Sequence, residues 1–476
     1  MLEEIIGSVI FFLKKEYERS YFHQIVDSFF ERLHLKEIPR LDIISLPERI
    51  VSPYLFIIVL IAFLGISDHG LSRMGILGFV MAISGFLLGI FSRNLRRPKI
   101  SEKYFLPLLI LFLICLAGLF NDWSLFLKIS LIPLVLLFLT GHHTRELFIM
   151  VFLGSMVILY KGFWGIALPY LFLSLLVLAT TIHGTIFDRN VRVIAFSCTF
   201  IGIFFWGLDS LLFGGFPLLS PEARGSLDAT YTMLSHLLPV GCVMTIIITR
   251  NRTASLILVG ISLVLMALLG YRTQVVLVML ASCFAAFIVK VISGSETIFL
   301  LFGTGGMAVF LTALRDVILQ TRIGILQAIQ ARISLSLDIY DMMAEMGGIL
   351  GYTKGQVYVA AFPYFARMMP GIAYSPRWYI AEMVGMDTSA TSTILGPLAV
   401  DFGLVGIFTG MVLLGYLLSK LYWKKTPLGT ALYSIILAYS LLGIETGIVD
   451  LEVLALFFLA FLYVLTSTEG DRIHSD

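Results

Sequence analysis

The sequence predicts an all-α polytopic membrane protein, and three observations lead to this prediction. Of the 476 residues, 58% are hydrophobic and 13% are charged, and the mean hydropathy is +0.95. These values lie far outside the range of soluble domains. Apolar runs of roughly 17–23 residues recur along the chain, and this is the length that a helix needs to cross the hydrocarbon core. A membrane β-barrel would instead show short segments of alternating polarity.

We expect about 14 transmembrane helices (roughly one per apolar run). Their expected positions are residues 53–67, 74–92, 104–120, 124–140, 147–161, 164–182, 192–214, 231–249, 254–270, 273–292, 297–314, 392–419, 427–445 and 448–466. The chain then divides into an interfacial amphipathic segment (1–52), a first set of helices (53–314), a long helical loop (315–391), a last set of helices (392–466) and a tail (467–476). Charged residues interrupt the apolar residues of the first segment, so we expect it to lie on the membrane surface and not to be a cleaved signal peptide.

The basic residues predict the orientation, because short cytoplasmic loops are rich in Lys and Arg. On one side lie the N-terminal segment, the stretch 93–99, Arg250 with Arg252, and Lys420 with Lys424 and Lys425. Short loops on the other side hold only Arg73, Lys161, Arg224 and Arg272. Both termini are therefore expected in the cytoplasm and the long loop outside the cell membrane. A reaction on that loop must use a substrate that is present outside, where ATP and nucleotide sugars are normally absent.

Composition and motifs exclude several functions. A net charge of +2 without a basic run interleaved with aromatics argues against a nucleic-acid partner. The chain has no HExxH, GxSxG, P-loop or CxxC motif, and its four cysteines lie in apolar runs without metal-ligand spacing. We therefore expect no metal site and no cofactor.

Ionisable residues near the outer ends of the helices are the first candidate site. Arg272 lies at a tight turn between two spans, Asp401 near the start of the twelfth, and the last external turn is flanked by Glu445, Asp450 and Glu452. Such groups are costly at this depth unless they pair or face a polar cavity. In a functional interpretation they line a vestibule. In a structural interpretation they pair with neighbouring Arg and Lys residues or lie hydrated at the membrane–water interface. Arg272 has a further structural interpretation, capping a helix end and reaching the headgroups.

The long loop is the second candidate, and it carries Arg315, Arg322, Arg332, Lys354, Arg367 and Arg377. Residues 322–345 have apolar side chains at helical spacing, which predicts an amphipathic helix. Glycines and prolines divide the rest into short pieces. Arginine suits a pyrophosphate ligand, because its planar fork makes two parallel hydrogen bonds and keeps its charge. The alternative is a solvated charged surface.

Three motifs in this region resemble the oligosaccharide repeat-unit polymerases of the O-antigen polymerase type, within the O-antigen polymerase/ligase superfamily. Gly270-Tyr271-Arg272-Thr273 is similar to the Gly/Ser-x-Arg-Ser/Thr turn of that superfamily. Gly355-Gln356-Val357-Tyr358, followed by Pro370, resembles the Gly-x-x-Tyr…Pro pattern of the polymerase loop. The stretch 391–406 resembles the segment by which that loop re-enters the membrane. The motifs cover about residues 255–420.

Two departures from the family pattern bear on the function. In the family an Arg commonly follows the loop proline, whereas here Gly371 follows Pro370. Ligases of the superfamily use a His in the external loop, and residues 315–390 contain none. The second departure argues against a ligase, and it leaves the identity of the general base undetermined.

The resemblance implies a GT-C-like glycosyltransferase that joins polyprenyl-pyrophosphate-linked oligosaccharides without a metal. The implied catalytic residues are Arg272, Arg332 and Arg377 on the leaving pyrophosphate, with Glu382 and Asp387 as candidate bases. The implied substrate-binding residues are Arg322, Tyr358, Arg367, Asp338 and Asp401. Asp338 is also a candidate base, and for Asp401 a structural or positioning role is favoured.

The implied partners are the lipid-linked oligosaccharide, the lipid bilayer and a chain-length regulator protein. Two alternatives stay open: a flippase or transporter for lipid-linked oligosaccharides, and a ligase-type membrane glycosyltransferase.

Overall fold

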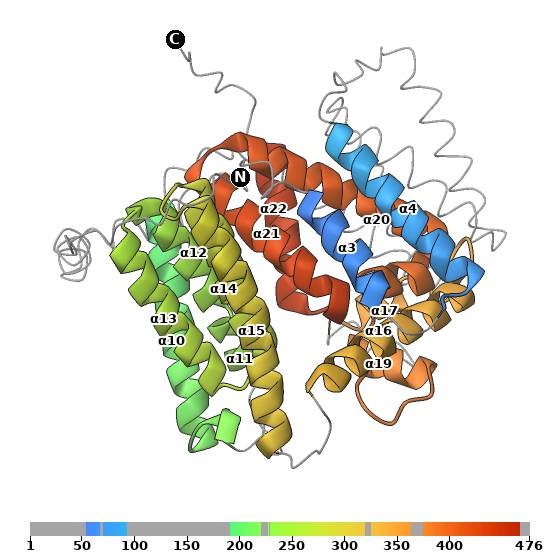
Figure 1. Ribbon diagram of the computed structural model, residues 1–476, viewed down its shortest axis with the longest axis horizontal. Helices are drawn as coiled ribbons and strands as arrows, with labels where there is room; N and C mark the ends of the chain where they lie inside the picture. Colours follow the sequence, from blue (N-terminus) through green and yellow to red (C-terminus); the bar gives the residue numbers. More distant parts are fainter. Residues whose placement is uncertain are drawn as a thin grey trace, which may run out of the picture. The chain divides into compact units, whose positions relative to one another are not determined.

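The computed structural model describes residues 54–66, 70–92, 191–219, 227, 229–318, 325–362 and 375–466, and every regular element in these ranges is a helix (Figure 1). The all-α prediction is therefore confirmed. The expected interfacial segment 1–52, the expected spans between 104 and 182, and the tail 467–476 lie outside the described residues.

Several described helices are apolar and long enough to cross a membrane. These are α4 (Arg73–Phe91), α10 (Val191–Phe213), the stretch Thr230–Thr249, α20 (Leu395–Lys424) and α21 (Pro427–Thr446). Shorter apolar helices are α3 (Tyr54–Ile66), α13 (Arg252–Leu268), α14 (Arg272–Ile288) and the stretch Leu451–Val464 of α22 (Leu451–Thr466). Each of these helices overlaps a range expected from hydropathy, which confirms a polytopic membrane protein.

The chain divides into two compact units. The first comprises Met1–Ile61, Thr185–Ala331 and Leu421–Leu442, and the second comprises Ala62–Gly184, Arg332–Lys420 and Gly443–Asp476. Most of α16 (Ile325–Gly347) belongs to the second unit.

Small residues allow the helices of the first unit to approach closely. In this unit α10, α12 (Leu237–Thr249), α13, α14 and α15 (Gly294–Ile318) lie side by side (Figure 1), with α11 (Ala229–Ser235) against α10. A Cβ atom at Gly202 would collide with Leu238, and one at Gly241 would collide with Thr199. Such contacts are typical of membrane helices, which associate through backbone proximity because lipid offers no hydrophobic driving force.

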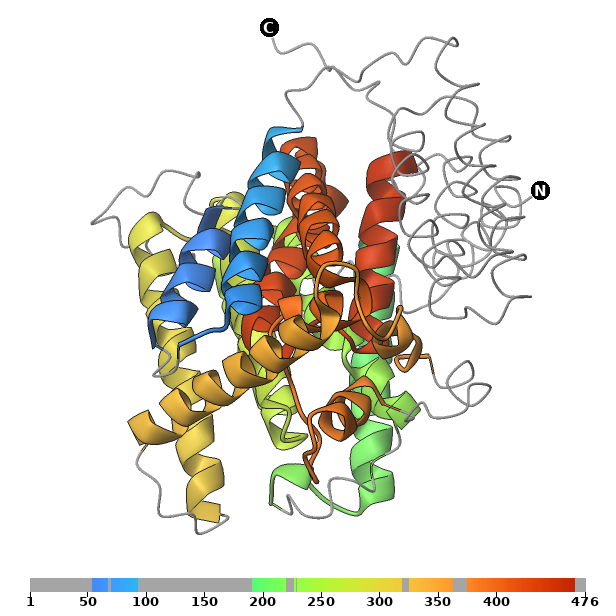
Figure 2. The same ribbon diagram turned by 90° about the vertical axis from the view of Figure 1, so that its right-hand side faces the viewer.

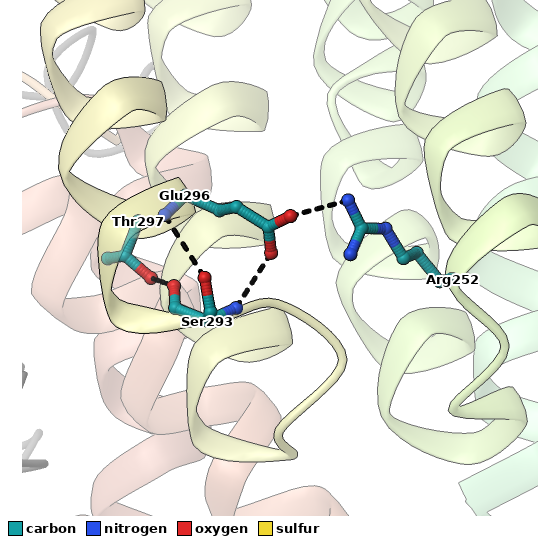
Figure 3. A network of polar contacts seen from close by, with 4 residues as sticks. All are labelled: Arg252, Ser293, Glu296 and Thr297. Carbon is teal, nitrogen blue, oxygen red and sulfur yellow. Dashed lines mark hydrogen bonds and ion pairs between the residues drawn. The ribbon is translucent and has the colours of Figure 1, made fainter. Parts of the chain in front are cut away.

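A polar network joins two helices of the first unit where α15 begins (Figure 3). The backbone N–H of Ser293 donates to Glu296 Oε2 at 2.8 Å, and the N–H of Glu296 donates to Ser293 Oγ at 3.3 Å, which is a capping box. The other carboxylate oxygen of Glu296 accepts from Arg252 Nη2 of α13 at 2.6 Å. The capping carboxylate thereby also joins α13 to α15.

In the second unit, α16 is held across the end of α4 (Figure 2). Asp341 of α16 accepts hydrogen bonds from the backbone N–H and hydroxyl of Ser72, the N-cap of α4. The Tyr340 hydroxyl donates to Gly75 O at 2.8 Å, and its ring meets Phe79 edge-on at 5.1 Å. A helix that crosses others in this way agrees with the amphipathic helix expected over 322–345.

Candidate functional site

The second unit positions a folded loop against a broken helix. Helix α20 is interrupted at Gly403, which has φ 66° and ψ −160°. The carbonyl of Val400 accepts from the N–H groups of Tyr352 at 2.7 Å and Thr353 at 3.1 Å. In return, the N–H groups of Leu404 and Val405 donate to the carbonyls of Gly348 and Ile349. Irregular backbone inside a membrane protein is tolerated where other protein groups satisfy it, and here residues 348–353 do so.

Two glycines make this approach possible. Gly351 and Gly403 both have positive φ, and a Cβ atom at either position would run into the backbone of the opposite segment. Larger residues would therefore force the loop away from α20.

Asp401, beside the break, holds the next turn of the loop. Its side chain is 0% exposed and accepts hydrogen bonds from the Thr353 hydroxyl and from the N–H groups of Val357 and Tyr358 at 3.2 Å each. These N–H groups belong to the first turn of the short helix α17 (Gln356–Val359) and have no partner within the helix. Asp401 therefore fixes the Gly-x-x-Tyr segment onto α20. The Gly-x-x-Tyr motif of the loop and the 391–406 motif, which contains Asp401, are thus joined directly by hydrogen bonds.

Aromatic residues complete the packing of this segment. The ring of Tyr358 stacks on Phe402 with centroids 6.2 Å apart. Tyr379 of α19 (Pro376–Met383) donates from its hydroxyl to Gln356 Oε1 at 2.6 Å. Burial first, then the charges of Asp401 and Glu382, raise the pKa of Tyr379 to about 12. The hydrogen bond from the Tyr379 hydroxyl to Gln356 joins α19 to α17.

Arg332 extends from α16 toward the turn between α21 and α22. Its Nε donates to Glu445 Oε1 at 2.9 Å, and its Nη2 donates to Thr391 Oγ1 at 3.2 Å. These two atoms form one edge of the guanidinium plane. Among the described residues, no hydrogen bond occupies Nη1.

Arg377 makes a second ion pair with the same turn. Its Nη2 lies 2.6 Å from Asp450 Oδ2, just before α22. The Arg377 carbonyl accepts from the Ala390 N–H at 3.1 Å, which closes the segment after α19. The Nε atom of Arg377 is buried and has no hydrogen-bond partner within the described part of the chain.

The two ion pairs are accessible. The side chains of Arg332 and Glu445 are 40% and 30% exposed, and those of Arg377 and Asp450 are 35% and 34% exposed. Of the two interpretations that the sequence left open, the structure shows pairing with arginine for Glu445 and Asp450. Exposed pairs of this kind are weak and leave guanidinium donors available.

The remaining predicted site residues have different surroundings. Arg272 is the first residue of α14 in the first unit, and Tyr271 before it packs edge-on against His236 with ring centroids 5.1 Å apart. Glu382 on α19 and Asp387 after it are exposed, and Asp338 on α16 is half-buried. Arg322 and Arg367 lie outside the described residues.

Sequence reasoning did not find the polar residues that hold the arginines and the loop. Gln356 and Thr391 lie within the family-like motifs but have no role predicted from them, and Thr353 lies in none of the motifs. The side chain of each makes one hydrogen bond to a distant residue. For Glu445 and Asp450 a signal existed, since two carboxylates flank a short turn between apolar helices. What the sequence did not supply was the pairing of each carboxylate with a particular arginine.

Comparison with known proteins supplies the remaining information. A family model described as "Putative O-antigen polymerase" matches residues 49–458. The chain is also 31% identical over 250 residues to an uncharacterised protein of Methanocaldococcus jannaschii, and the alignment covers 51% of this chain and 67% of that relative. No solved structure matches the chain.

Proposed function

The chain belongs to the O-antigen polymerase family, and from this premise we propose that it joins lipid-pyrophosphate-linked oligosaccharide repeat units on the outer face of the cell membrane. The reaction is a glycosyl transfer. A hydroxyl of one lipid-linked unit attacks the anomeric carbon of a second glycan, and that glycan leaves its pyrophosphate carrier.

The observation that carries the proposal is the pair of accessible arginines around one turn. Arg332 and Arg377 come from separate helices of the polar loop. Arg332 pairs with Glu445 in the last turn of α21, and Arg377 pairs with Asp450 just before α22. Charge builds up on the pyrophosphate as its bond to the sugar breaks. Fixed guanidinium groups stabilise such charge without reorganising during the reaction. Each well-placed donor lowers the activation free energy by about 3 kcal/mol.

The carboxylates orient the arginines but also reduce the positive charge of the site. A pyrophosphate must therefore bind through guanidinium atoms that the carboxylates leave available, or displace a carboxylate. Displacement has a low cost, because an ion pair this exposed contributes only about 0.2–1 kcal/mol. Arg272 belongs to the first unit and has no place in either pair. Its proposed role on the pyrophosphate rests on the family resemblance of its turn alone.

The loop contributes a fixed geometry. Positioning a reacting group to within about 1 Å strongly affects rate, and a free loop could not hold Arg377 to that tolerance. The hydrogen bonds that join residues 348–353 to α20, and Asp401 to α17, fix the loop on a membrane helix. In this proposal Asp401 is a positioning residue, and Glu382 and Asp387 stay candidate bases.

The test is polymerisation in proteoliposomes. Purified protein is supplied with lipid-pyrophosphate oligosaccharide from the host in the presence of EDTA, and the product is resolved as a glycan ladder. We expect the wild type to form a ladder and Arg272→Ala and Arg332→Ala to lose it. The control is Arg192→Ala, an exposed arginine of α10 outside the site.

Three results would contradict the proposal in different ways. Loss of the wild-type ladder in EDTA would contradict the metal-independent mechanism. Transbilayer movement of labelled lipid without a ladder would support a flippase. Ladders of wild-type strength in both arginine variants would contradict the assigned roles.

A further inference from the structure

We propose that Glu445 is the general base that takes the proton from the attacking hydroxyl, an inference that rests on the proposed function. In this step the acceptor O–H bond breaks and its proton goes to the Glu445 carboxylate. The acceptor oxygen forms a bond to the anomeric carbon. The bond from that carbon to the pyrophosphate oxygen breaks, and its electron pair stays on the lipid pyrophosphate. The proton on Glu445 is then lost to water.

The geometry around Arg332 supports this assignment. Glu445 and Thr391 occupy the edge of the guanidinium formed by Nε and Nη2. The adjoining edge, which carries Nη1, can bind a pyrophosphate while the first edge keeps its partners. One planar group can thus hold the leaving group and the carboxylate at the same time.

The spacing that results suits the reaction. A carboxylate oxygen and a phosphate oxygen on adjacent edges of one guanidinium lie about 5–7 Å apart, given hydrogen bonds of about 2.9 Å on each side. In a displacement the attacking and leaving oxygens lie on opposite sides of the anomeric carbon. A base that is held beside the pyrophosphate, but not in contact with it, can reach the attacking hydroxyl.

Accessibility also favours Glu445. Its side chain is 30% exposed and that of Arg332 is 40% exposed, so a glycan can reach the pair without unfolding the loop. A buried carboxylate such as Asp401 has its oxygens occupied by loop donors and cannot approach a sugar.

Other carboxylates fit less well. Glu382 and Asp387 are exposed, and the described structure shows no ion pair between either of them and an arginine that could hold the leaving group. Asp450 pairs with Arg377 through Nη2, while the Nε of that arginine is buried. Arg377 therefore has fewer accessible donors for a pyrophosphate beside its carboxylate.

The decisive variant is Glu445→Gln, whose side-chain carbonyl can still accept from Arg332 Nε but whose amide cannot take a proton. We expect kcat for polymerisation to fall about 100-fold or more, with KM for the lipid-linked oligosaccharide within a few-fold of wild type. Glu345→Gln, at an exposed glutamate of α16 with no part in the site, is the matched control and is expected to keep wild-type kcat. A second variant, Glu445→Ala, should regain part of its rate with added formate, which replaces the missing carboxylate.

The outcomes separate the inference from the proposed function. A wild-type protein that makes no ladder overturns both. A wild-type ladder together with undiminished kcat in Glu445→Gln overturns only the inference, as does a loss confined to Asp450→Asn or Glu382→Gln. A Glu445→Gln protein with a lowered melting temperature and no formate rescue in Glu445→Ala would show a structural role and would also overturn it.

Discussion

Removing the Asp401 carboxylate should release the polar loop from α20 without unfolding the membrane helices. In Asp401→Asn, one oxygen can still accept from Thr353 and Val357, but the new amide N–H₂ faces the Tyr358 N–H, so a donor meets a donor. One buried donor left unsatisfied costs about 1–3 kcal/mol. Asp401→Ala removes all three acceptor contacts, and we expect a cost of about 3–6 kcal/mol.

Hydrogen–deuterium exchange of the purified protein in nanodiscs measures this release locally. Each 1.4 kcal/mol of lost protection corresponds to about tenfold faster exchange. Peptides that contain Val357 and Tyr358 should therefore exchange about 5–150-fold faster in Asp401→Asn, and faster still in Asp401→Ala. Asp387→Asn, which changes an exposed carboxylate of the same loop, should leave these peptides unchanged.

Two results would refute this reasoning. If both Asp401 variants exchanged at the wild-type rate around α17, the carboxylate would not hold the loop. If exchange rose equally in α14 of the first unit, the effect would be global destabilisation and not release of a loop.

Three further predictions follow from single contacts. Gly403→Ala should destabilise the protein by about 2–4 kcal/mol, because alanine is strained at positive φ and its Cβ would meet the opposite backbone; Gly260→Ala, with open space around it, should be neutral in the same thermal-shift assay. Arg252→Ala and Glu296→Gln should each lower the free energy of unfolding by about 2–4 kcal/mol, because each leaves one charge of the ion pair without its partner. The double variant should lose less than the sum of the two single variants, and a double-mutant cycle of melting temperatures measures the difference. Arg377→Lys should keep the pair with Asp450 but lower kcat/KM for the lipid-linked substrate about tenfold, since lysine lacks the planar fork; an unchanged kcat/KM would indicate that Arg377 only holds the turn.

The sequence predicted the helical elements well because their signal is local. The helical spacing of Ile333, Leu337 and Tyr340 predicted α16, and all three are buried. The same holds for the hydrophobic runs that became α4, α10 and α20. A period of 3.6 residues is visible in any window of one sequence, whatever the rest of the chain does.

The site was predictable only as a set of candidates, because its contacts are long-range. Arg332 and Glu445 are 113 positions apart, and Arg377 and Asp450 are 73 positions apart. The loop offers several basic residues and the neighbouring segments offer several carboxylates, so many ion pairs are compatible with the sequence. No local pattern indicates which arginine pairs with which carboxylate. The break of α20 at Gly403 shows the same limit, since a glycine in an apolar run is ordinary until a distant loop satisfies the freed backbone.

These long-range contacts connect stability with the proposed chemistry. A membrane helix that breaks at Gly403 would be costly alone, because its freed carbonyl and N–H groups need partners. The loop supplies those partners, and in return the helix fixes the segment that continues into α17 and α19, which carries Arg377. An uninterrupted α20 would have no backbone groups left to hold the loop. Arg377 of the loop would then have to be ordered anew in each catalytic cycle. The helix break is therefore better understood as the attachment point of the site than as a defect of the span. Variants that loosen this attachment, such as Asp401→Asn, should consequently lower kcat even though Asp401 never touches the substrate.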